Sequence, residues 1–185
     1  MIIFSGNTKE GKPYVIRNLE AGDTEAMMRY INKLSLEQTY ILRQGEQSTY
    51  EEEKKFVDDQ LKQMKDGKAL YLVIESENCI IGATQINLKE KVHSHVGHLG
   101  ISLALSYRDQ GLGAKLLGVV IERSKIELPS MKIIDLSVFA INDRAKHLYE
   151  KFGFKEFGRL PKGVFYKGEY VDHIYMHRDV IMSST

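Results

Sequence analysis

Residues 101–114 read ISLALSYRDQGLGA, which predicts an apolar strand, a short polar turn and a helix whose first turn contains Gly111 and Gly113. The first amide N–H groups of a helix have no partner within the helix, and the aligned peptide dipoles give that end a partial positive charge. Glycine lets an anion approach the backbone without a Cβ in the way. Arg108 and Lys115 can add full positive charge nearby. The stretch is therefore typical of a binding site for a diphosphate group.

The glycine pair by itself allows more than one interpretation. A tight strand-to-helix connection with close packing explains it equally well. A Walker phosphate loop is excluded, because neither Lys-Ser nor Lys-Thr follows the glycines. A dinucleotide-binding fingerprint is excluded too, because Leu116 stands where its third glycine would be. An unrelated nucleotide-binding domain, in which Gly111 and Gly113 hold a different phosphate, stays open as an alternative.

A second motif follows about 30 residues later, where residues 142–154 read NDRAKHLYEKFGF. This stretch predicts a helix that ends at a glycine and carries Tyr149 on its apolar side. The pattern RxxGxG at residues 108–113 resembles the Arg/Gln-x-x-Gly-x-Gly/Ala signature of the GNAT superfamily of N-acetyltransferases. Residues 142–154 resemble that superfamily's second motif, Asn-x-x-Ala-x-x-Leu-Tyr-x-x-x-Gly-Phe. Two motifs in the expected order are far more specific than either motif alone.

The order of the expected elements predicts an α/β chain with a mixed sheet of about seven strands flanked by about four helices. Expected strands cover residues 14–17, 69–75, 79–88, 98–105 and 133–139, and a strand-rich tail (154–178) has turns at Gly158, Gly163 and Gly168. Expected helices cover residues 50–66, 110–125 and 142–152, and a further helix capped by Asp23 carries the stripe Met27, Tyr30, Ile31 and Leu34. The resemblance implies a GNAT-like acyl-CoA N-acyltransferase fold. We expect a single N-acetyltransferase domain over residues 1–185, with the cofactor-binding core at about 98–154.

The composition narrows the classes of partner. The chain has 185 residues with 26 basic and 25 acidic side chains, so no broad charge favours nucleic acid or an anionic membrane as a partner. No segment approaches the ~20 apolar residues of a membrane span, and residues 1–6 lack the features of a signal peptide. Cys79 is the only cysteine, so an internal disulfide is excluded, and we expect it to be a small buried side chain near a hairpin. The expected location is cytoplasmic.

The resemblance implies acetyl-CoA as the co-substrate. The strand at 101–103 would pair with the thioester carbonyl and the pantetheine arm as an added strand, where it splays from the strand at 133–139. Backbone amides at 109–114 would bind the diphosphate, and Asn142 would contact the cofactor where the second helix begins. The implied cofactor-binding residues are Ile101, Ser102, Leu103, Arg108, Asp109, Gln110, Gly111, Leu112, Gly113, Ala114 and Asn142.

The resemblance also implies a catalytic acid, Tyr149, which would protonate the departing thiolate. From its position alone, Tyr149 is equally explained as a core tyrosine beside Leu148 and Phe152. A phenol with an ordinary pKa of about 10 stays protonated at neutral pH, so it can serve as an acid.

Many relatives have a carboxylate as the catalytic base, on the strand before the first motif or on the strand before the second. This chain departs from that pattern, because it has no acid at the usual position within residues 96–100 or within residues 135–138. Asp135 lies near the second of these positions but is displaced from Ser137 by about 6–7 Å along an extended strand. His98 is the candidate base, acting through water, because imidazoles exchange protons near neutral pH. A solvent-facing histidine without a catalytic role is an equal alternative, and direct capture of a neutral amine would need no base. The pair His93 and His95 lacks a third ligand nearby, so no metal is expected.

The combined prediction is an acetyl-CoA-dependent N-acetyltransferase. A primary amine of a small molecule, amino acid or peptide would attack the thioester directly, without a covalent enzyme intermediate. Residues 158–172 resemble the ending of relatives that acetylate small amines or amino acids and often pair, so a homodimer is a possible assembly. The alternative is a catalytically silent acyl-CoA-binding sensor or partner-binding module, which the missing carboxylate keeps open.

Overall fold

A computed structural model describes residues 1–180 and divides them into two compact units. The first unit contains residues 1–87 and 100–129, and the second contains residues 88–99 and those from 130 onward. Within the described range, no helix is both long enough and apolar enough to cross a membrane. That the chain acts as a single domain stays a prediction.

The first unit contains five neighbouring strands in the order β1-β2-β3-β4-β5. Their bounds are β1 (Ile2–Asn7), β2 (Pro13–Asn18), β3 (Ala69–Ser76), β4 (Cys79–Leu88) and the C-terminal half of β5 (Val96–Leu103). The pairs β1–β2, β2–β3 and β3–β4 are antiparallel, and the last of these is the predicted hairpin. Cys79 begins β4 at the hairpin but is exposed, so the expectation that it is buried was wrong.

Strand β1 was missed by the sequence analysis. Its residues are exposed or half-buried without strict alternation, and it pairs on one side only, with β2. An edge strand of this kind has no strong apolar pattern, so the sequence signal is weak. The described residues therefore form eight strands with four α-helices, where about seven strands were expected, and the predicted mixed α/β class is confirmed.

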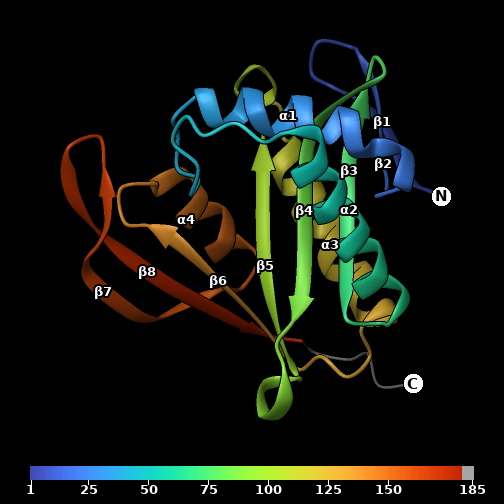
Figure 1. Cartoon of the computed structure of the whole chain (residues 1–185). Coiled ribbons are helices and arrows are strands. Elements are labelled where there is room, and N and C mark those ends of the chain that lie inside the picture. The colour runs from blue at the N-terminus through green and yellow to red at the C-terminus, as the bar shows by residue number, and fades with distance from the viewer. Residues whose placement is uncertain (181–185) are drawn as a thin grey trace. The chain divides into compact units, whose positions relative to one another are not determined.

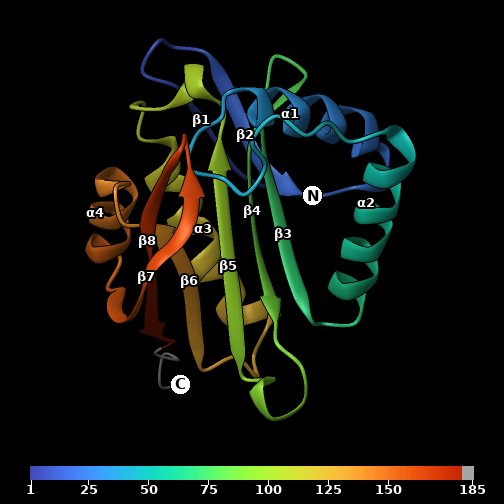
Figure 2. The ribbon, with the colours of Figure 1, turned by 60° about the vertical axis from the view of Figure 1, so that its left-hand side comes forward.

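The helices of the first unit are α1 (Thr24–Leu36), α2 (Tyr50–Lys65) and α3 (Leu112–Glu127). Figure 1 and Figure 2 show α1 and α2 over one face of this unit's strands and α3 over the opposite face. The predicted α1 stripe is confirmed, because Met27, Tyr30 and Leu34 are buried in one core cluster with residues of β3. Asp23 precedes α1, but its carboxylate pairs with Arg17 and makes no capping bond to α1.

The second unit contains the N-terminal half of β5, β6 (Ile133–Phe139), α4 (Asp143–Lys151), β7 (Lys155–Tyr166) and β8 (Glu169–Asp179). The strand order is β5-β6-β8-β7, with β6 parallel to β5 and antiparallel to β8. Strand β6 thus has a neighbour on each side, which confirms that residues 133–139 do not form a sheet edge.

The tail folds as one long hairpin, β7–β8, and two of its three expected turns were wrong. Gly158 and Gly163 lie inside β7 at shifts of the pairing register, which are bulges rather than chain reversals. The reversal occurs at Lys167 and Gly168, with φ of +50° and +85°. Two consecutive residues with positive φ are typical of the tight turn that suits the twist of a hairpin.

Candidate functional site

The connection between β5 and α3 is a sharp bend over residues 108–111, which we call the bend. Asp109 and Gly111 have φ of +63° and +79°, a left-handed conformation that glycine adopts without strain. The helix begins at Leu112, two residues later than expected, so Gln110 belongs to the bend. A Cβ placed on Gly111 would have no heavy atom within 4 Å, so the backbone there is open to an approaching group.

The first turn of α3 presents unpaired amide groups next to this open backbone. The first helical hydrogen bond runs from Lys115 N to Gly111 O, with a length of 3.1 Å. The N–H groups of residues 112–114 come before it and have no carbonyl partner within the helix. A helix of 16 residues adds a partial positive charge at the same end. This geometry suits a bound phosphate or diphosphate.

The side chain of Arg108 does not supply free charge to the bend, in contrast to the expectation. Its Nη2 donates to Glu37 Oε2 over 2.7 Å, and its Nε and Nη2 donate to Leu103 O over 3.0 and 2.8 Å. Glu37 Oε1 also accepts from Leu105 N over 2.9 Å. Glu37 therefore ties the end of α1 to the end of β5 and neutralises the guanidinium. The two residues are far apart in sequence, so no local pattern reveals the pair.

The end of β5 uses alternate residues for pairing with β4. Ala104 N donates to Ile81 O over 3.0 Å, and Thr84 Oγ1 donates to Gly100 O over 2.8 Å. Since backbone groups alternate in direction along a strand, those of Ile101 and Leu103 are directed away from β4. The carbonyl of Leu103 is taken by Arg108, as described above.

The side chain of Ser102 is fixed from the helical side. Its hydroxyl shares a hydrogen bond of 2.8 Å with the hydroxyl of Tyr30, which lies on α1. Burial raises the pKa of Tyr30 well above its ordinary value, and the bond to Ser102 acts in the opposite direction. Tyr30 therefore stays neutral, and this pair adds a second link between α1 and the strand expected to line the pantetheine arm.

In the second unit, β5 pairs with β6 through Val96↔Ile133, Gly97↔Ile134 and His98↔Asp135. The last of these pairs brings together the side chains of His98 and Asp135, which are far apart in the sequence. His98 Nδ1 lies 2.7 Å from Asp135 Oδ1, and Lys89 forms an ion pair with the other carboxylate oxygen. The His98 side chain is 52% exposed and that of Asp135 is 13% exposed. Asp135 thus holds the ring of His98 by Nδ1 and leaves Nε2 for other partners.

Two opposing effects act on the carboxyl of Asp135. Burial by itself would raise its pKa, but hydrogen bonds from His98 and Lys89 and their charges outweigh burial and lower it. We therefore expect Asp135 to be ionised at neutral pH.

We expect Asp135→Asn to lower the free energy of unfolding at about pH 7 by about 1–3 kcal/mol, because Lys89 and His98 lose a charged acceptor. The pKa of Asp135 is lower in the folded than in the unfolded chain. Its stabilisation is therefore complete above an unfolded value of about 4 and is lost as the pH falls through the folded value. Urea unfolding of both proteins between about pH 2 and 7 measures this difference. Equal stability of the two proteins across that range would contradict the prediction.

The two predicted site residues of α4 have clear local roles in the second unit. Asn142 caps the helix, because its Oδ1 accepts from Ala145 N over 3.2 Å. Tyr149 is buried, and its ring lies 5.9 Å from that of Phe154 in an edge-on arrangement. Burial raises the pKa of Tyr149 to about 12, so its phenol is protonated at neutral pH. Contacts of either residue with a cofactor stay predictions.

The family model described as the acetyltransferase (GNAT) family matches residues 34–154, a range that includes the bend, His98 and Tyr149. The chain belongs to this family. The match confirms the resemblance that the two motifs indicated.

Individual relatives of this GNAT chain agree with the match. The chain is 32% identical over 100 residues to the L-amino acid N-acetyltransferase AaaT of Escherichia coli, covering 54% of this chain and 61% of that protein. The alignments thus span about three fifths of the length of the curated relatives that it matches. An acetyltransferase of the GNAT family from Streptococcus pneumoniae has 26% identity and a TM-score of 0.83, covering 91% of this chain and 99% of that one.

A further GNAT-like structure has a bound cofactor. It is yncA, a putative acetyltransferase from Salmonella typhimurium solved with acetyl-CoA, with 15% identity and a TM-score of 0.78 over 93% of this chain and 96% of that one. At this identity the likeness shows the fold alone.

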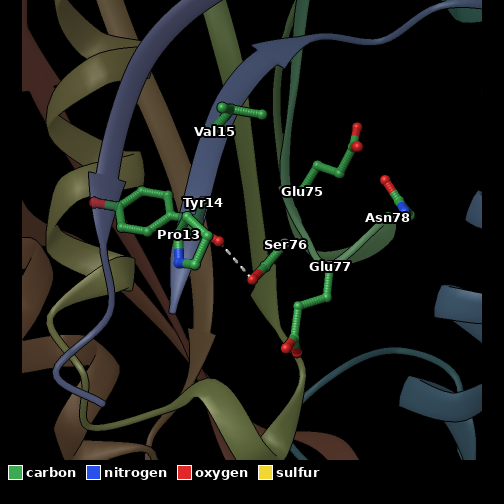
Figure 3. A pocket seen from close by; sticks show the side chains of 7 residues that line it. All are labelled: Pro13, Tyr14, Val15, Glu75, Ser76, Glu77 and Asn78. Atoms are coloured by element: carbon green, nitrogen blue, oxygen red, sulfur yellow. Dashed lines mark hydrogen bonds between the residues drawn. The ribbon is translucent and has the colours of Figure 1, made fainter. Parts of the chain in front are cut away.

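A shallow pocket lies apart from the bend in the first unit, between the start of β2 and the β3–β4 turn (Figure 3). Ser76 Oγ donates to Pro13 O over 2.8 Å across it. Its two acidic side chains already have partners, because Glu75 pairs with Arg17 and Glu77 pairs with Lys12. The pocket therefore offers no free charge, and the bend stays the predicted site.

His93 and His95, the other histidine pair of the sequence analysis, are exposed. Within residues 1–180, no group of three or more His, Cys, Asp or Glu side chains is placed to hold a metal ion. The absence of a metal from the reaction stays a prediction.

Proposed function

We propose that this GNAT protein transfers an acetyl group from acetyl-CoA to a primary amine. The bend supports this proposal most directly. It combines an open Gly111, left-handed turns and unpaired amides at the start of α3, and it lies inside the range that matches the family model. Such a site fits the diphosphate of the acyl carrier, which supplies the activated acetyl thioester when it is bound.

The proposed reaction is a direct transfer in which this chain's residues orient the reactants and move protons. Backbone N–H groups of Ile101 and Leu103 stabilise the negative charge that develops on the acetyl oxygen. A C–N bond forms as the neutral amine attacks the acetyl carbon, and the C–S bond breaks. Tyr149 gives its proton to the departing sulfur and regains one from solvent. The proton lost by the amine passes through water to His98.

The Asp135 carboxylate supports the role proposed for His98. It accepts from Nδ1 of the ring, so the lone pair that receives a proton is on Nε2. A carboxylate beside an imidazole also stabilises the imidazolium that forms. In this proposal, His98 and Asp135 together take the place of the carboxylate that the family pattern puts on the strand before the bend.

For the acceptor we propose the amine of an amino acid, a small molecule or a peptide N-terminus. The support is the 32% identity to a relative named an L-amino acid N-acetyltransferase. A panel of amino acids, polyamines, aminoglycosides and short peptides, with release of free thiol as the readout, tests the activity and the acceptor together. We expect turnover with at least one amine class.

The same panel separates the enzyme from a sensor module, the second candidate function. A sensor is favoured by the lack of a family-type carboxylate on β5, where the only candidate base, His98, is half exposed. Saturable binding of acetyl-CoA without thiol release for any amine would identify the sensor and overturn the proposed enzyme.

We further propose a cytoplasmic protein that forms a homodimer. The support is the single, exposed Cys79 and the resemblance of residues 158–172 to relatives that pair. Light scattering after size-exclusion chromatography would give the mass of the assembly, and a mass of one chain would contradict the dimer.

A further inference from the structure

The bend needs a source of full positive charge other than Arg108. Helix amides and the helix dipole supply only partial charge, whereas a diphosphate carries full negative charges. Glu37 neutralises Arg108 and holds it against Leu103 O. The β1–β2 hairpin, whose first strand is not predicted from the sequence, brings Lys9 to the same place.

Lys9 contacts the bend directly. Its Nζ donates to the backbone carbonyl of Asp109 over 2.7 Å, across 100 positions of the chain. A lysine ammonium has three N–H donors, so two remain after this bond. Among the residues that the structure describes, no carboxylate forms an ion pair with Lys9, in contrast to its neighbour Lys12. The ammonium is thus held at the bend by a backbone carbonyl rather than by a carboxylate.

The turn that carries Lys9 is itself fixed. Thr8 N donates to Lys12 O over 2.8 Å, and Gly11 N donates to Thr8 O over 3.0 Å. Thr8 is buried, and Lys12 N donates to its hydroxyl oxygen over 3.2 Å. These bonds fix the backbone that carries Lys9, so less backbone freedom is lost when the ammonium binds a ligand.

The hairpin also meets the first turn of α3. The Nζ of Lys115 lies 4.2 Å from the centroid of the Phe4 ring, which is the range of a cation–π contact. Phe4 belongs to β1, and its ring lies 6.1 Å from that of Tyr14 on β2. The hairpin therefore contacts the site twice: Lys9 of its turn bonds to the bend, and Phe4 of β1 contacts Lys115 in the first turn of α3.

We propose that Lys9, carried by the β1–β2 turn, binds a phosphate group of the nucleotide half of coenzyme A, in the place where the sequence suggested Arg108. This inference rests on the proposed function and adds a residue from outside the family motif to its site. The ligand chemistry is a phosphate ester dianion or diphosphate, which the ammonium recognises as a point charge.

The test measures the affinity for coenzyme A by isothermal titration calorimetry for the unaltered protein, Lys9→Met, Lys9→Arg and Lys12→Met. Lys12→Met is the matched control, because it removes the same charge from the same turn. Lys12 pairs over 2.9 Å with Glu77, which lines the pocket in Figure 3. Thermal unfolding of each variant shows that the fold is kept.

We expect Lys9→Met to weaken binding about 10-fold at low salt and Lys12→Met to change it less than about twofold. The effect of Lys9→Met shrinks as salt rises, and Lys9→Arg keeps most of the affinity. An equal loss in Lys9→Met and Lys12→Met, or no loss in either, overturns the inference. Failure of the unaltered protein to bind coenzyme A instead overturns the proposed function.

Dephospho-coenzyme A identifies which phosphate Lys9 binds. If Lys9→Met weakens coenzyme A and dephospho-coenzyme A alike, the lysine binds the diphosphate. If only coenzyme A is weakened, the lysine binds the 3′-phosphate. Both results support the inference, because each assigns a phosphate to Lys9.

Discussion

Gly111→Glu is expected to lower the affinity for acetyl-CoA by at least about 100-fold. The glutamate would place a negative charge and a side chain in the open space where the diphosphate is proposed to lie. Position 111 also has φ of +79°, so any other residue adds backbone strain of about 1–2 kcal/mol. Calorimetric titration with acetyl-CoA measures the loss.

The matched control for this variant is Gly67→Glu. Gly67 is an exposed glycine with φ of +66°, it follows α2, and a Cβ there would also meet nothing within 4 Å. Gly67→Glu therefore adds the same charge and a similar strain away from the bend, and we expect it to bind acetyl-CoA normally. Equal affinities for Gly111→Glu and Gly67→Glu would show that the bend does not hold the carrier.

Tyr149→Phe is expected to lower kcat about 100-fold while it changes the KM for acetyl-CoA by less than about threefold. The reason is that the phenol acts on the sulfur only as the C–S bond breaks. Phenylalanine keeps the ring that contacts Phe154, so the fold should be retained. Steady-state thiol release with the best amine of the panel gives both constants.

The control for Tyr149→Phe is Tyr71→Phe, which removes another buried hydroxyl from a core strand. We expect Tyr71→Phe to leave kcat within about threefold, as is usual for residues outside the chemistry. The pKa of about 12 adds a second check, because Tyr149 loses its proton only as the pH approaches that value. A fall in rate with a midpoint near pH 9 that disappears in Tyr149→Phe would contradict the burial-raised pKa.

The elements that the sequence predicted well are those with strong local patterns. The stripe of α1, the β3–β4 hairpin and the central position of β6 all follow from apolar periodicity and short polar turns. Strand β1 has no such pattern, because it is a half-exposed edge strand. The bend could be located from sequence because the positive φ of Gly111 restricts the residue type at that position.

The side-chain pairs of the candidate site could not be predicted from sequence. Glu37 meets Arg108 only because α1 folds over the end of β5, and His98 meets Asp135 only through the register of two parallel strands. Parallel register depends on a crossover connection and not on adjacent residues. Arg108, the candidate for positive charge at the bend, is therefore neutralised by Glu37. His98, the candidate base, is held by Asp135.

Glu37 accepts hydrogen bonds from both Leu105 N and Arg108, and this has a consequence for how ligands affect one another. The Glu37 carboxylate connects residues 37–49, which follow α1, to the end of β5. A displacement of one of these segments therefore displaces the other. Thermodynamic reciprocity then requires that any ligand that displaces residues 37–49 changes the affinity for the acyl carrier by the same factor as the carrier changes the affinity for that ligand. We therefore expect such a ligand and the acyl carrier to bind cooperatively rather than independently.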